Sequence, residues 1–73
     1  MKITDIRAMR NRVPFRPFAI HLSNGDVFEV QHPEQMSLPD DEKEMFVIWT
    51  NRDWNLIDAS QVARVSVLRK GAK

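Results

Sequence analysis

Hydrophobic residues near the N-terminus recur every three or four positions. This spacing predicts one apolar stripe on a short amphipathic helix over residues 4–12. Thr4 is the expected N-cap, and Pro14 forbids helical geometry at the residue before it. A helix this short is unstable alone in water, so we expect its stripe to dock on a sheet. The residues of the stripe are Ile3, Ile6, Met9 and Val13.

Beyond the helix, runs rich in β-branched and aromatic residues predict strands. The five expected strands cover residues 18–22, 27–31, 45–50, 54–58 and 63–68. The run at 45–50 is apolar on both faces, which predicts a central strand buried on two sides. In the last strand, Val65 and Val67 are expected to face inward. The connecting segments are a short one at 35–38, an acidic loop at 39–44, a turn at 51–53 and a single helical turn at 58–61.

The turn between the first two strands determines their register. A two-residue loop of Asn24 and Gly25 would put Glu29 opposite Ile20, on the buried face. A three-residue loop over 23–25, with Gly25 in a bulge, instead brings Phe28 opposite Ile20. Phe18 then faces Val30, whereas Ala19, His21, Val27 and Glu29 point outward. Because a one-residue slip moves every side chain to the other face, we predict the three-residue loop.

This order of elements predicts a mainly-β protein, with an N-terminal helix followed by a five-stranded antiparallel small barrel, SH3-like or Sm-like. We expect one small domain over residues 1–68 and a flexible basic tail over 69–73. A 73-residue chain without cysteine has a small core and no disulfides. An apolar face shared with a second copy, as in a homo-oligomer, would compensate for this small core.

Charge is unevenly distributed along the chain. Residues 1–16 carry five basic side chains and one acidic, residues 26–44 carry one basic and seven acidic, and residues 64–73 carry four basic. Opposite patches of this kind suit head-to-tail self-association or a charged partner, although ordinary solvated surface explains them equally well. No apolar run approaches the length of a membrane span or a signal peptide, so we expect a cytoplasmic protein without a membrane partner.

The residues that usually carry chemistry are sparse. His21 and His32 have no other ligand at metal-binding spacing, and the acidic loop lacks the pattern of a calcium site. Cysteine is absent and the serines have no candidate base, so no catalytic residue is predicted. The two glycines cannot form a phosphate loop. We therefore expect neither an enzyme nor a metal or cofactor site.

Two groups of residues form the candidate binding surface. Trp49 and Trp54 flank a turn, with Arg52 between them. The two rings could stack on bases beside Arg52, or one tryptophan could fill the core while the other covers the barrel edge, or the group could contact a protein. Basic residues of the predicted helix and its C-terminal flank are candidates for phosphate contacts, although a pI near 8.2 is low for a dedicated nucleic-acid domain. These basic residues are Arg7, Arg10, Arg12 and Arg16.

Two resemblances add to these predictions. The string from Pro14-Phe15-Arg16-Pro17-Phe18 through Ile20-His21-Leu22-Ser23-Asn24-Gly25 to Phe28-Glu29-Val30 and His32-Pro33-Glu34 resembles a group of small uncharacterised bacterial proteins. That group implies no activity. The order of elements is also similar to the bacterial Sm-like RNA chaperones, which form RNA-binding rings. Their RNA-binding basic triplet before the last strand corresponds here to Leu56-Ile57-Asp58, which has an acidic residue and no basic one. The resemblance therefore implies the barrel but not the RNA site.

Together these features predict a non-enzymatic interaction module that acts by protein–protein contact, as a homo-oligomer. The alternative is an Sm-like module that binds RNA through its basic N-terminal helix.

Overall fold

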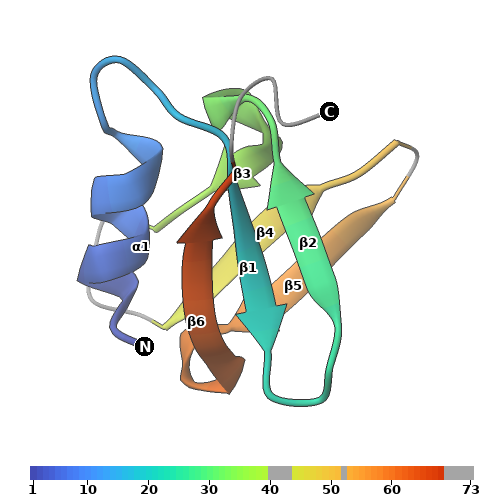
Figure 1. Cartoon of the computed structure of the whole chain (residues 1–73). Helices are drawn as coiled ribbons and strands as arrows, with labels where there is room; N and C mark the ends of the chain where they lie inside the picture. The colour runs from blue at the N-terminus through green and yellow to red at the C-terminus, as the bar shows by residue number, and fades with distance from the viewer. Residues whose placement is uncertain (40–43, 52, 69–73) are drawn as a thin grey trace.

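The computed structural model describes residues 1–39, 44–51 and 53–68 (Figure 1). Within these residues there are one helix and six strands, and the predicted mainly-β class with an N-terminal helix is confirmed. The helix is α1 (Ile3–Arg10), and the 3-10 turns are η1 (Pro33–Gln35) and η2 (Ala59–Gln61). The strands are β1 (Phe18–Leu22), β2 (Val27–Val30), β3 (Met36–Ser37), β4 (Met45–Trp49), β5 (Trp54–Asp58) and β6 (Val62–Val67). The acidic segment 40–43 and the predicted tail at 69–73 lie outside the described residues.

The strands form two antiparallel sheets of three strands each. Their orders are β2-β1-β6 and β3-β4-β5. The chain passes from the first sheet to the second through η1 and returns through η2 (Figure 1). Within the described part of the chain, the hydrogen-bonded ladders do not join the sheets into a closed barrel. The prediction of five strands was wrong because β3 has only two residues, too few to show a period.

The core lies between the facing sides of the two sheets. Each sheet supplies fully buried large side chains, among them Phe18 and Ile20 from β1 and Phe46 and Ile48 from β4. The helix adds Ile3 and Ile6, of which Ile6 is completely inaccessible to solvent. The predicted docking of the helix on the sheets is therefore confirmed. The remaining members of this core are Val30, Met36, Ile57, Ala59 and Val62.

The first hairpin has the predicted register. Phe28 lies opposite Ile20 and Val30 lies opposite Phe18. The loop is closed by a 3.0 Å bond from the Gly25 N–H to the Leu22 carbonyl and a 2.8 Å bond from the Leu22 N–H to the Asp26 carbonyl. Gly25 has a φ of 98°, a conformation that residues with a side chain rarely adopt. The three-residue loop with Gly25 in a bulge is confirmed.

Replacing Gly25 by alanine is expected to destabilise the protein by about 1–2 kcal/mol. A Cβ added at this position has no atom within 4 Å, so the cost comes from the backbone conformation and not from a clash. The midpoint of urea unfolding measures it. Gly25→Asn is the matched control, because asparagine tolerates positive φ better than alanine and should lose less stability. Equal losses in the two variants would contradict this explanation.

The limits of the helix differ from those predicted. The helix begins at Ile3 with Lys2 as its N-cap residue, and no side chain caps it, so Thr4 is not the N-cap. It ends at Arg10. Val13 is 92% exposed and does not belong to the buried stripe, because the helix stops three residues before it. Val13 therefore matches the spacing of the stripe by chance and is not a member of it.

Burial along the strands corrects three further predictions. On β4, Phe46 and Ile48 are buried but Met45 is 39% and Trp49 48% exposed, since no described element covers the outer face of the second sheet. Ala19 is buried despite its outward position, because Glu29 and Ser66 flank this small residue on both neighbouring strands. At the end of β6, Val65 packs against the core, whereas Val67 remains 44% exposed.

The passage from β2 to β3 depends on the side chain of Gln35, whose role was not predicted. Its Oε1 atom accepts hydrogen bonds from the backbone N–H groups of Gln31 (2.7 Å) and His32 (2.9 Å). Its Nε2 atom donates to the Trp49 carbonyl at 3.2 Å. One side chain therefore joins the end of the first sheet to the second.

Candidate functional site

The outer face of the second sheet carries a contiguous group of apolar side chains, which we call the tryptophan face. In the β4–β5 register, Trp49 lies opposite Trp54 and Val47 lies opposite Leu56. Trp54 is 60% exposed, Leu56 57% and Trp49 48%. The face consists of Met45, Val47, Trp49, Trp54 and Leu56. Exposed apolar patches of this kind usually mark a binding surface.

The two tryptophans contact each other across the β4–β5 hairpin. Their ring centroids are 6.4 Å apart with an interplanar angle of 46°, within the range favoured by aromatic pairs. The expectation of one tryptophan in the core and one over the barrel edge is wrong, because both lie on the exposed face. The signal for this was the alternation within 45–49 and 54–58, which assigns Phe46, Ile48 and Ile57 to the inside.

The hydrogen bonds of this hairpin show which backbone groups of β5 are free. The backbone N–H of Thr50 donates to the Asp53 carbonyl at 2.8 Å, and the backbone N–H of Ala59 donates to the Glu44 carbonyl at 2.6 Å. Residues 50 and 53, and residues 44 and 59, are therefore hydrogen-bonded pairs. Such pairs alternate with non-hydrogen-bonded pairs along an antiparallel ladder, so residues 48 and 55, and residues 46 and 57, are hydrogen-bonded pairs too. Trp54 and Leu56 belong to the other kind of pair, and their N–H and C=O groups point away from β4.

Strand β5 is an edge of its sheet (Figure 1). Among the described residues, no hydrogen bond reaches the backbone N–H or C=O groups of Trp54 and Leu56. These groups lie along the border of the tryptophan face. The same strand therefore offers exposed apolar side chains on one face and free backbone donors and acceptors at its edge.

Acidic side chains stand at both ends of the tryptophan face. Asp53 is exposed in the turn, while Glu44 and Asp58 lie next to Met45 at the far end of the hairpin. In the described parts of residues 44–58, every charged side chain is acidic. Arg52, a predicted member of the binding surface, lies outside the described residues. Of the three acidic residues, Asp58 shares the face with Trp54 and Leu56 in the strand register. The N-terminal ammonium group lies near that end of the hairpin, where it donates to the Ala59 carbonyl at 3.2 Å.

The Asp58 carboxylate is held in its ionised form. Its Oδ1 atom accepts a 2.9 Å hydrogen bond from the backbone N–H of Ser60 at the start of η2. This bond, assisted by the Ser60 hydroxyl, lowers the pKa of Asp58 below its usual value. Asp58 is thus an anion at neutral pH.

The lowered pKa predicts a pH-dependent contribution to stability. Since the pKa of Asp58 is lower in the folded state, its stabilising effect is complete above the unfolded-state value and is lost as the pH falls through the folded-state value. We expect Asp58→Asn to lower the urea midpoint at neutral pH. The difference from the parent should shrink as the pH is lowered from about 6 to about 2. A difference independent of pH would contradict this role of the carboxylate.

The predicted basic residues do not join the tryptophans in one surface. The α1 helix and the β4–β5 turn lie on opposite sides of the molecule (Figure 1). The Arg7 Nη2 atom donates to the Pro39 carbonyl at 2.6 Å, and the Arg10 Nη1 atom donates to the Met36 carbonyl at 3.3 Å. Arg7 and Arg10 thus fasten the helix to the chain around β3. Arg12 and Arg16 are exposed beyond the helix.

The histidines make contacts within the fold. The His21 Nε2 atom lies 2.9 Å from the Ser66 hydroxyl on the neighbouring strand β6, a pair that was not predicted. A histidine acting as a base needs a third group to orient its other nitrogen, and none contacts that nitrogen among the described residues. No cluster of three His, Cys, Asp or Glu side chains able to hold a metal occurs in the described ranges.

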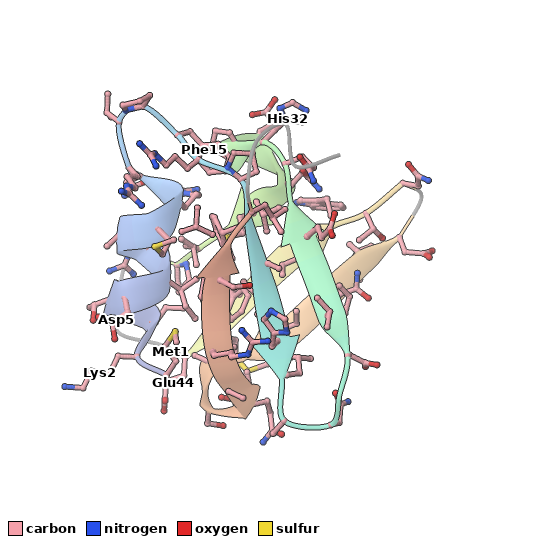
Figure 2. All side chains as sticks on the ribbon, viewed as in Figure 1. Met1, Lys2, Asp5, Phe15, His32 and Glu44 are labelled. Carbon is pink, nitrogen blue, oxygen red and sulfur yellow. The ribbon has the colours of Figure 1, made fainter. Side chains whose placement is uncertain are left out.

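A hollow of about 380 Å³ lies beside the N-terminus of α1, and the described residues that line it are Lys2, Ile3, Thr4 and Glu44. Figure 2 shows the labelled side chains of Lys2 and Glu44 pointing outward and away from each other. Two charged groups that diverge into solvent do not converge on a ligand. The tryptophan face is therefore the stronger candidate site.

No family model, curated protein or solved structure matches this chain. Within the described residues, no helix is both long and apolar enough to cross a membrane.

Proposed function

We propose that this protein is a non-enzymatic interaction module that binds another protein through the tryptophan face. The observation that carries the proposal is the exposed pair of Trp49 and Trp54, backed by Leu56 on the same face. Tryptophan is enriched among the residues that dominate the energy of protein interfaces. Burial of these side chains would add stability to a domain with a core this small, so their exposure favours a role in binding.

We also propose that the fold is a variant of the SH3-like or Sm-like small barrel. The helix, the tight hairpin, the passage between sheets and the 3-10 turn before the last strand support this relation. Membership of the group of small bacterial proteins and a cytoplasmic location remain predictions from the sequence.

Peptide selection tests the function directly. A phage-displayed library of random peptides is selected on the immobilised protein, and the affinity of each enriched peptide is then measured. We expect Trp54→Ala and Trp49→Ala each to weaken binding about 30-fold, the effect of an interface hot spot near 2 kcal/mol. Val27→Ala is the matched control, because Val27 is 51% exposed on the first sheet. Peptides that bind the tryptophan variants as well as the parent would refute the proposal, provided that circular dichroism shows all variants to be folded.

The alternative of RNA binding through the helix has weaker support. Arg7 and Arg10 already donate to backbone carbonyls, which leaves Arg12 and Arg16 as the exposed members of the predicted set. Binding of single-stranded RNA that falls steeply between low salt and about 0.2 M salt, and that is lost in the Arg12→Ala/Arg16→Ala variant, would favour this alternative.

A further inference from the structure

We infer that the free edge of β5 accepts an extended, basic segment of another protein as a fourth strand of the second sheet. The side chains of that segment would lie along the tryptophan face. This inference rests on the proposed function and specifies the partner and the mode of binding.

The backbone of β5 supplies the first argument. The free N–H and C=O groups of Trp54 and Leu56 are two residues apart, the repeat with which an added strand pairs. Proteins usually protect such edges with lysine, proline or a covering element. Strand β5 contains neither lysine nor proline, and it has five residues, in contrast to the two residues of the opposite edge strand β3. The β5 edge is thus the better place for strand addition in this sheet.

The side chains of β5 supply the second argument. Trp54, Leu56 and Asp58 alternate along the same face, so an added strand would place every second side chain beside them. An arginine or lysine beside Asp58 would form an opposite-charge pair across the strands. A cation above the exposed ring of Trp54 would gain a cation–π interaction. An apolar residue would fit beside Leu56. On the side of the added strand that continues the tryptophan face, basic and apolar side chains therefore alternate, and they are two residues apart in the sequence of the segment.

Charge and area argue against a second copy of the chain as the occupant. In a symmetric face-to-face contact, each copy would bring the Asp58 carboxylate, which shares the face with Trp54 and Leu56, to a surface that carries the same negative group. The exposed parts of the four large side chains on the face amount to on the order of 400 Å², if an aromatic side chain has about 150–250 Å². A standard interface takes about 800 Å² per partner. A short basic segment suits the face better than a stable dimer.

The test uses fluorescein-labelled peptides and fluorescence anisotropy. The probe repeats the order Arg-Thr-Val-Thr, and the control peptide has glutamate in place of arginine. We expect the basic peptide to bind at least tenfold more tightly than the acidic one at low salt. Trp54→Ala should weaken binding of the basic peptide at least tenfold, whereas Val27→Ala should not.

Backbone methylation of the peptide distinguishes strand addition from simple contact with the face. Methylating the N–H groups of one set of alternate residues should weaken binding at least tenfold, and methylating the other set should have little effect. If both methylated peptides bind like the parent peptide but Trp54→Ala still abolishes binding, strand addition is refuted and the proposed function stands. If Trp54→Ala has no effect, both are refuted.

A variant of the protein gives an independent test. Leu56→Pro removes a free donor without removing a bond of the β4–β5 ladder, and Leu56→Thr is its matched control. We expect the proline variant to bind at least tenfold more weakly than the threonine variant. The methylated peptides decide the question if the proline variant does not fold. Self-association that the peptide cannot displace in sedimentation, or tighter binding of single-stranded RNA to this face, would overturn the inference.

Discussion

Replacing Phe46 by alanine is expected to leave the chain unfolded at 25 °C without denaturant. Phe46 is 1% exposed at the centre of the core, and truncation of a buried phenylalanine costs about 3–5 kcal/mol. The core of a domain this small rarely supplies more than about 3–5 kcal/mol of net stability. The loss is therefore comparable to the whole free energy of unfolding. Far-UV circular dichroism and urea titration measure the result.

The adjacent residue provides the control for this prediction. Met45 lies on the same strand but faces outward and is 39% exposed. We expect Met45→Ala to stay folded, with a loss below about 1 kcal/mol. A Phe46→Ala variant with a cooperative transition close to that of Met45→Ala would show that the two faces of β4 do not differ in burial as described.

Replacing Ile6 by alanine is expected to detach the α1 helix from the sheets. Ile6 is completely buried, and its truncation costs about 2–5 kcal/mol. The helix has eight residues, below the length of about 12–15 at which isolated helices become marginally stable. Once undocked, it should therefore unwind. Loss of helical circular dichroism and fast hydrogen exchange of the amides in α1 would report this change.

Thr4→Ala is the control on the same helix. Thr4 is exposed and its side chain caps nothing, so the stability of this variant should lie within about 0.5 kcal/mol of the parent. If Ile6→Ala and Thr4→Ala show equal hydrogen exchange in α1, the contact of Ile6 with the core does not hold the helix in place.

Local sequence patterns predicted those elements whose geometry depends on neighbouring residues alone. The period of two and the three-residue loop around Gly25 were enough to obtain the register of β1 and β2, because only that register keeps Phe18, Ile20 and Phe28 on one face. The two residues of β3 carry no period. Their place in the second sheet depends on the distant strand β4 and on the side chain of Gln35, so no local pattern could predict it.

The candidate site was predicted only in part, for a similar reason. Trp49 and Trp54 stand out as residue types beside a turn, whereas Leu56 and Met45 resemble core residues until it is known that nothing described covers the second sheet. The contacts of Arg7 and Arg10 with backbone carbonyls could not be inferred either, because they require the docked position of α1. Local spacing predicts which face a residue occupies, and the packing of layers decides whether that face is covered.

The interleaved order of the two sheets has a consequence for folding during synthesis. Strand β1 lies between β2 and β6, so one of its two neighbours is the last strand to be made. Until β6 emerges, one edge of β1 is unpaired and the side chains of its buried face lack part of their cover. The β4–β5 hairpin can pair locally before that, since its ladder connects neighbouring residues. A nascent chain should therefore complete its second sheet first, with the apolar strand β1 unpaired along one edge until β6 is made.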